Sequence, residues 1–260
     1  MQLPIFQVDA FTTSCFGGNP AAVCPLPYWL DDSTLQKIAD ENNLSETAFF
    51  VVSGGKIALR WFTPEAEVDL CGHATLAAAH VLHTHLQHPE KTLKFDTRSG
   101  TLIVNCNVAG YEMDFPATEI KPVATPATLQ RALNVPIVET LVGFDYIVRV
   151  ESEVELRELA PDLALLGELD LRGVVVTAPG EQCDFVSRCF FPKLRVNEDP
   201  VTGSAHCELA PYWALELNKS TLHARQISKR SGDITCTLKD DRVVLLGQAV
   251  DYLQGTITLP

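Results

Sequence analysis

An internal repeat constrains the fold of this chain more than any other feature of its sequence. Residues 60–64 (RWFTP) reappear as residues 188–192 (RCFFP), and residues 71–75 (CGHAT) as residues 202–206 (TGSAH). The tripeptide Arg-Ser-Gly at 98–100 recurs 132 residues later. The matches keep their order at offsets of 128 to 132 residues, close to half of the 260-residue chain. The sequence therefore predicts two halves that share one fold.

Composition excludes several classes of protein. With 46% hydrophobic and 20% charged residues, the chain can bury a sizeable core, so it is not intrinsically disordered. A net charge of −13 repels phosphate backbones and anionic lipids, which argues against nucleic acid or a membrane as a partner. No apolar run reaches the roughly 18 residues of a membrane span, and the start of the chain lacks a basic signal-peptide region. We therefore expect a soluble, cytoplasmic protein.

Cysteine and histidine spacing argues against a structural metal. None of the eight cysteines forms a C-x-x-C pair, so free thiols are the simpler interpretation. His80, His83, His85 and His88 are clustered and could suggest metal binding, but no acidic ligand lies among them and H-E-x-x-H is absent. We interpret them as exposed imidazoles at a helix end. We expect neither a metal nor a cofactor.

A proline-rich segment at 116–126 divides the chain. It contains three prolines and no sustained periodicity, which is typical of a linker. We place the halves at residues 1–117 and 118–260, with the last strand able to cross back to the first half. Elsewhere the pattern predicts mainly strands, at 5–10, 48–52, 57–62, 93–97, 101–106, 112–115, 141–150, 173–177, 185–191, 225–228, 234–238, 243–246 and 252–259.

Three helices are expected among these strands. One covers 33–42, capped by Asp31 or Asp32. The other two follow the repeated glycine motif, at 74–86 and at 204–218, the second kinked or interrupted at Pro211. The helix at 74–86 is apolar on nearly all sides, so it is buried. The pattern predicts an α+β fold made twice, in which a mainly antiparallel sheet surrounds one buried helix. The cleft between two such units is the natural site.

The glycine motif also points to an anion site. Gly72 and His73 open the first buried helix, and Gly203 and Ser204 open the second. The first N–H groups of a helix lack intrahelical partners and carry the positive end of the helix dipole. The two helix starts could therefore hold a carboxylate or oxyanion between them. The alternative is a tight strand-to-helix turn with a satisfied Ser or His cap.

Two carboxylates are placed where they could take part in chemistry. Asp199 precedes Ser204 on the loop into the second helix, where it could orient a histidine or bind a substrate amine, or only form an Asx turn before Pro200. Glu46 stands immediately before an apolar run. Partial burial there would raise its pKa toward the range useful for general acid-base catalysis, whereas a solvated strand end is the simpler alternative.

Five motifs together resemble one known family. They are residues 8–11 (VDAF), 16–23 (FGGNPAAV), 44–49 (LSETAF), 71–75 (CGHAT) and 198–205 (EDPVTGSA), and the chain is similar over essentially its whole length to the PhzF-like isomerases of phenazine biosynthesis. The resemblance implies a diaminopimelate epimerase-like fold of two pseudo-symmetric halves. It also implies cofactor-free proton transfer on a small carboxylate-bearing substrate, with Glu46 as the acid-base group. His73, Asp199 and Ser204 would bind substrate, and the protein would form a homodimer.

One departure from the related epimerases matters for the reaction. Those enzymes use two cysteines, one before each glycine of the repeated motif, because inversion needs an acid and a base on opposite faces. Here Cys71 holds the first place, but Thr202 holds the second, and its hydroxyl is a much weaker base. We therefore expect isomerisation by one carboxylate. An epimerase or racemase using Cys71, a non-catalytic small-acid-binding or interaction protein, and a metal-dependent hydrolase are the alternatives. The substrate is undefined and need not be a phenazine precursor.

Overall fold

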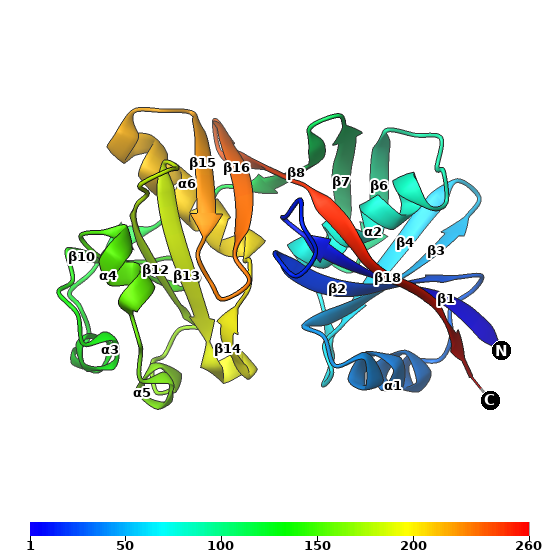
Figure 1. Ribbon diagram of the computed structural model, residues 1–260, viewed down its shortest axis with the longest axis horizontal. Helices are drawn as coiled ribbons and strands as arrows, with labels where there is room; N and C mark the ends of the chain where they lie inside the picture. The colour runs from blue at the N-terminus through cyan, green and yellow to red at the C-terminus, as the bar shows by residue number, and fades with distance from the viewer. Residues whose placement is uncertain (260) are drawn as a thin grey trace. The chain divides into compact units, whose positions relative to one another are not determined.

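The chain forms two compact units in the computed structural model, which describes residues 1–259 (Figure 1). The first unit comprises Met1–Asp114 and the residues from Leu246 onward, and the second is Phe115–Leu245. The C-terminal strand therefore belongs to the first unit. Within residues 1–259, no helix is long and apolar enough to cross a membrane.

A curved sheet with two helices makes up the first unit. Strand β18 pairs with β1 and β1 with β2; the order continues through β3, β4, β6, β7 and β8, antiparallel except for β2–β3 and β4–β6. The elements are β1 (Gln2–Ala10), β2 (Asn19–Leu26), α1 (Asp32–Asn42), β3 (Glu46–Ser53), β4 (Lys56–Phe62), β5 (Glu67–Val68), α2 (Gly72–Thr84), β6 (Thr92–Thr97), β7 (Gly100–Asn107), β8 (Gly110–Pro116) and β18 (Ala249–Thr258).

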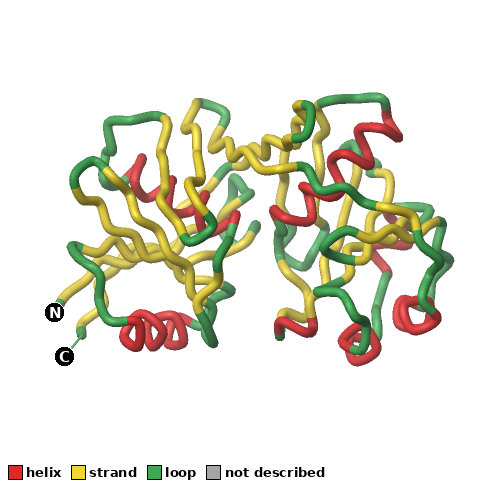
Figure 2. Tube along the Cα trace, turned by 180° about the vertical axis from the view of Figure 1, so that it is seen from behind, coloured by secondary structure: helices red, strands yellow, loops and turns green. Residues whose placement is uncertain are grey.

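Pairing of β1 with β18 brings the two ends of the chain together. Gln2 lies opposite Thr258, and the Met1 amino group donates to the carbonyl oxygen of Leu259 at 2.7 Å. Figure 2 shows the two ends side by side. The C-terminal strand thus completes the first unit although the second unit precedes it in sequence.

The second unit is also a mainly antiparallel sheet. Strand β9 pairs with β10, then β11, β12, β13, β15 and β16 follow, with parallel pairing only at β11–β12 and β13–β15 among these. The elements are β9 (Lys121–Pro122), α3 (Ala127–Leu133), β10 (Glu139–Val142), β11 (Tyr146–Arg149), α4 (Glu153–Glu158), α5 (Leu163–Gly167), β12 (Val174–Pro179), β13 (Phe185–Phe191), the 3-10 helix η1 (Pro192–Leu194), β14 (Val196–Asp199), α6 (Gly203–Leu217), β15 (Thr221–Gln226), β16 (Gly232–Lys239) and β17 (Arg242–Gly247).

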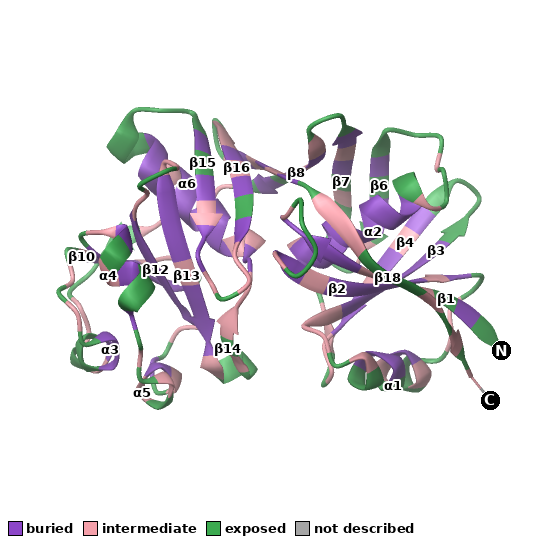
Figure 3. Ribbon diagram, viewed as in Figure 1, coloured by how far each residue is buried: buried purple, intermediate pink, exposed green. Residues whose placement is uncertain are grey.

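One central helix is buried in each unit. Ten of the 13 residues of α2 are buried, and so are nine of the 15 residues of α6 (Figure 3). A helix with apolar residues on nearly all sides avoids water only inside a surrounding sheet, and α2 packs on β1, β2, β3, β7 and β18. The predicted α+β class, a mainly antiparallel sheet around a buried helix in each half, is confirmed.

A kink or an interruption was expected at Pro211, and helix α6 continues through it, so the interruption is wrong. Proline has no N–H to donate to the carbonyl oxygen of Cys207, four residues earlier. The backbone N–H of Thr118 donates to that oxygen instead, at 3.1 Å. The lost helical bond is thus replaced within the second unit, and the helix does not end.

The repeat in sequence is matched by a repeat in local structure. Arg60 in β4 binds Glu67 through two hydrogen bonds of 2.6 and 2.7 Å, and its guanidinium lies 5.0 Å from the Phe62 ring centroid. Arg188 in β13 binds Glu198 through bonds of 2.7 and 3.0 Å and lies 5.1 Å from the Phe190 ring. The repeated Arg-x-Phe therefore serves the same purpose twice: it ties a central strand to the segment that leads into the buried helix.

Candidate functional site

Glu46 is the first residue of β3 and lies beside the start of α2. Its side chain is 19% exposed, and Oε2 lies 3.2 Å from Nε2 of His73. The apolar residues that follow Glu46 are buried because β3 is a central strand, which holds the carboxylate at the end of that strand. The Glu46 side chain is therefore not fully solvated, in contrast to the simpler alternative considered from the sequence.

His73 lies between Glu46 and Cys71. The imidazole belongs to the first turn of α2, and its Nδ1 lies 3.5 Å from Sγ of Cys71, the residue just before the helix. Burial lowers the pKa of His73 to about 3, so the ring is neutral and carries one N–H. Nε2 faces Glu46 Oε2 at 3.2 Å without hydrogen-bond geometry, and Nδ1 is the ring nitrogen that faces the Cys71 thiol.

This arrangement suits proton transfer better than metal binding. Glu46, Cys71 and His73 offer three possible ligand atoms within 4.8 Å of one another. The two nitrogens of the imidazole, however, face different neighbours: Nε2 faces Glu46 and Nδ1 faces Cys71. A neutral ring of such low basicity can hold a carboxylate in place without taking its proton.

A second group of three possible metal ligands lies near the other end of α2. It consists of His80, His85 and Asp251. Within residues 1–259, this group and the Glu46 group are the two sets of three possible ligands. The interpretation of the histidine cluster as exposed imidazoles holds for His83 alone, because His80 is buried and His85 and His88 are half-buried. The acidic residue beside these histidines is Asp251 of β18, which lies far from them in the sequence.

In the second unit, Asp199 and Thr202 are fixed to each other and to Gln226. The Thr202 hydroxyl donates to the Asp199 carboxylate, and the Gln226 amide donates to the Asp199 carbonyl oxygen at 2.7 Å. The Thr202 backbone N–H donates to Gln226 Oε1 at 2.8 Å. Thr202 is therefore held by hydrogen bonds to both Asp199 and Gln226.

Both glycines of the repeat are the first residues of their helices. The N-cap residues are Cys71 and Thr202, and within residues 1–259 neither side chain forms a capping hydrogen bond. The helix starts therefore differ from the Ser or His cap considered from the sequence. A Cβ atom added to Gly203 would meet only Leu245 Cδ1 at 3.6 Å, an ordinary contact. Packing does not demand glycine at 203, whereas close approach of a ligand to the backbone would.

Ser204 contacts a buried charged cluster that sequence analysis missed. Arg172 donates to the Ser204 hydroxyl at 3.1 Å and holds Asp145 through two hydrogen bonds, of 3.0 and 2.5 Å. Glu208 Oε1 accepts the backbone N–H of Phe144 at 2.8 Å. Burial, reinforced by the nearby Asp145 charge, raises the pKa of Glu208 to about 7. No motif marks these residues, because Asp145 and Arg172 lie on separate loops and meet Glu208 of α6 only in the folded unit.

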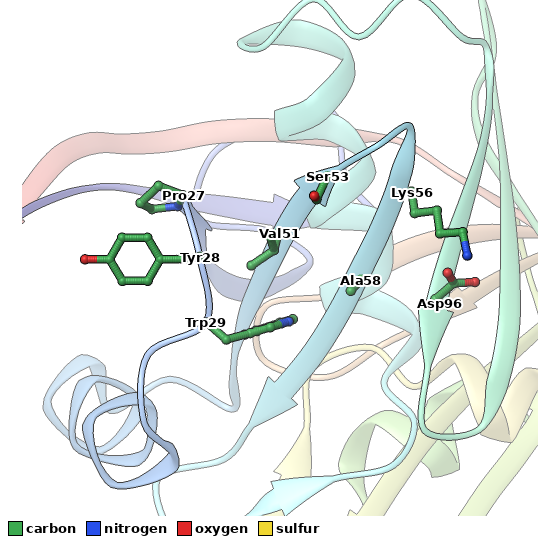
Figure 4. Close-up of a pocket in the computed structure, with 8 residues that line it drawn as sticks. All are labelled: Pro27, Tyr28, Trp29, Val51, Ser53, Lys56, Ala58 and Asp96. Atoms are coloured by element: carbon green, nitrogen blue, oxygen red, sulfur yellow. The ribbon is translucent and has the colours of Figure 1, made fainter.

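A surface pocket of the first unit does not contain the candidate residues. It has a volume of about 420 Å³ and lies beside β3 and β4 (Figure 4). Lys56 and Asp96 lie near each other at one end of it, and aromatic residues lie at the other. Its lining is Pro27, Tyr28, Trp29, Val51, Ser53, Lys56, Ala58 and Asp96.

Comparison with known proteins gives a consistent result over the whole chain. The family model described as "Phenazine biosynthesis-like protein" matches residues 8–255. A protein of Pseudomonas aeruginosa named as an uncharacterized isomerase is 54% identical over 259 residues, covering all of both chains. Another protein with that description, from Halalkalibacterium halodurans, is 48% identical and is also covered completely.

Solved structures agree with this result. The crystal structure of a PhzF-family phenazine biosynthesis protein from Enterococcus faecalis superimposes with a TM-score of 0.98 at 48% identity, covering all of both chains. A hydroxyproline epimerase from Agrobacterium vitis superimposes with a TM-score of 0.61 at 11% identity, covering 98% of this chain and 92% of that one. At such low identity the second similarity concerns the fold alone.

Proposed function

The chain belongs to the phenazine biosynthesis-like family and is an isomerase, and from this premise we propose that Glu46 moves a proton between two carbons of a small carboxylic acid. The observation that carries the proposal is the 3.2 Å approach of Glu46 to the neutral imidazole of His73. In the proposed reaction the Glu46 carboxylate takes a proton from an activated C–H bond. The resulting carboxylic acid returns a proton to a different carbon on the same face, so no cofactor is required.

His73 supports this role as a neutral neighbour of the Glu46 carboxylate. A histidine of ordinary basicity beside Glu46 would compete for the proton in transit. Burial makes the His73 imidazole a much weaker base, with a pKa of about 3, so it does not take the proton from Glu46.

Substrate binding is the proposed role of the helix starts and of Asp199. Gly72 and His73 begin α2, while Gly203 and Ser204 begin α6, and the N–H groups of a first helical turn favour an anion. We assign each helix start, taken within its own unit, to an anionic group of the substrate, and Asp199 to positioning the substrate. This part of the proposal rests on the sequence repeat and on the local geometry of each helix start.

Cys71 is assigned no proton-transfer step. Its thiol faces His73 Nδ1 at 3.5 Å, and an imidazole with a pKa of about 3 is too weak a base to generate the thiolate. Replacement of Cys71 by Ala should therefore leave most of the turnover. An epimerase that uses Cys71 would lose it.

The test is a screen of small carboxylic acids in deuterated water, read by mass spectrometry. Wild-type protein should incorporate deuterium into at least one acid, and Glu46→Gln should lower the rate by about 100-fold or more, the usual value of general acid-base catalysis. Glu41→Gln, at an exposed residue of α1, is the matched control and should change nothing. An active Glu46→Gln variant would contradict the assignment. Acids that bind without any exchange in wild type would support the non-catalytic alternative.

A further inference from the structure

Two histidines and one aspartate converge near the C-terminal end of α2. Nε2 of His80 lies 3.2 Å from Oδ1 of Asp251, and Nε2 of His85 lies 2.9 Å from the same oxygen. His80 belongs to α2, His85 immediately follows its last residue, and Asp251 belongs to β18. We propose that these three side chains bind a divalent transition-metal ion, with Zn²⁺ the best match to two imidazoles and one carboxylate.

The spacing fits a tetrahedral ion. Zinc binds imidazole nitrogen and carboxylate oxygen at about 2.0–2.2 Å, so two ligand atoms of a tetrahedral site are about 3.3 Å apart. The two N···O separations observed, 3.2 and 2.9 Å, are close to that value, and the three ligand atoms lie within 4.8 Å of one another. Small side-chain movements would admit the ion, and water would take the fourth position.

Neighbouring groups orient both imidazoles for this purpose. The Tyr111 hydroxyl lies 2.9 Å from Nδ1 of His80, which leaves Nε2 directed at Asp251. Histidine ligands of metals commonly have such a hydrogen bond at the second nitrogen. The ring of Phe6 packs against His85 with a centroid separation of 4.6 Å.

A bulge in the sheet directs Asp251. Gln7 pairs with Leu253, whereas the next residue, Val8, pairs with Asp251, so β18 contains one extra residue at this point. Such bulges redirect side chains. The Asp251 side chain is 40% exposed, which gives an ion a path from solvent.

The proposed metal site is separate from the proposed catalytic group. His80 lies seven positions after His73 in α2, a rise of about 10 Å along the helix. The metal would connect the end of α2 to the C-terminal strand and so stabilise the first unit. Failure of the Glu46 proposal would leave this inference intact, and the reverse also holds.

The test is metal binding by untagged protein stripped with a chelator. Titration with Zn²⁺ in a calorimeter, and with Co²⁺ by visible absorption, should show one tight site. Asp251→Asn and His85→Gln should each weaken binding by at least about 100-fold, and Tyr111→Phe by about 10- to 100-fold. His83→Gln, at an exposed histidine of the same helix, is the matched control and should bind as wild type does.

Circular dichroism of each metal-free variant separates loss of the site from loss of the fold. Asp251→Asn keeps the size of the side chain, so a folded variant with weakened binding supports the proposal. Wild-type protein that binds no Zn²⁺, or that binds it with equal affinity in Asp251→Asn and His83→Gln, would overturn it.

Discussion

Acidification should destabilise the second unit through His206, a histidine fully buried in α6. Its Nδ1 lies 2.8 Å from the carbonyl oxygen of Thr202, and burial lowers the pKa of His206 from 6.5 to about 4. Below pH 6.5 the unfolded chain takes up a proton that the folded unit cannot accept until about pH 4. Stability contributed by the neutral ring is therefore complete above pH 6.5 and falls as the pH decreases toward 4.

The size of the effect follows from this difference. Each pKa unit corresponds to about 1.36 kcal/mol, so the full window between 6.5 and about 4 is worth roughly 3 kcal/mol. Between pH 7.5 and pH 5 the unfolded state gains close to one proton at this position. The free energy of unfolding should therefore fall by about 2 kcal/mol through His206 alone.

Urea denaturation at a series of pH values measures this effect. Trp213 reports on the second unit, because it is buried and stacks on Phe185, a neighbour of His206. His206→Asn should show a fall between pH 7.5 and 5 that is smaller than in wild type by about 2 kcal/mol. His223→Asn, at an exposed histidine of the same unit, is the control and should follow wild type. Equal pH dependence in wild type and His206→Asn would refute the reasoning.

Three further predictions concern ligand binding, stability and assembly. Gly203→Val should weaken binding of a carboxylate ligand in a calorimetric titration, whereas Ser204→Ala should lose no more than about 1 kcal/mol; equal effects would contradict the anion site. Arg172→Met should destabilise the protein to urea by about 3 kcal/mol, because fully buried Asp145 loses its partner, and the exposed control Arg131→Met should not. We also propose a homodimer, because closed two-fold pairs are the commonest assembly, and light scattering that finds only a 28.5 kDa species at micromolar concentration would refute it.

The sequence repeat and the pattern of apolar residues predict most of the fold. Matches such as RWFTP with RCFFP predicted two similar units, because each places an arginine and a phenylalanine in the same contact. Apolar residues on nearly all sides of 74–86 predicted a buried helix, which α2 is. The segment at 141–150, in contrast, was expected to be one strand and forms two, β10 and β11, because the chain turns at Gly143.

Long-range contacts account for what the sequence did not reveal. Asp251 joins His80 only because β18 returns to the first unit, and no local pattern near the histidines indicates an acidic neighbour. Arg172, Asp145 and Glu208 are likewise scattered in sequence and meet only after folding. Glu46 and His73 also meet only in the folded unit, although a separate motif marks each of them as a candidate.

The position of deuterium in the product tests the central claim most directly. An acid that exchanges with the wild-type protein is converted in deuterated water, and NMR locates the deuterium in the product. Transfer by Glu46 predicts deuterium at a carbon different from the one that lost its proton, with loss of the reaction in Glu46→Gln and its retention in Cys71→Ala. Deuterium at the original carbon with inverted configuration, lost in Cys71→Ala, would contradict the account.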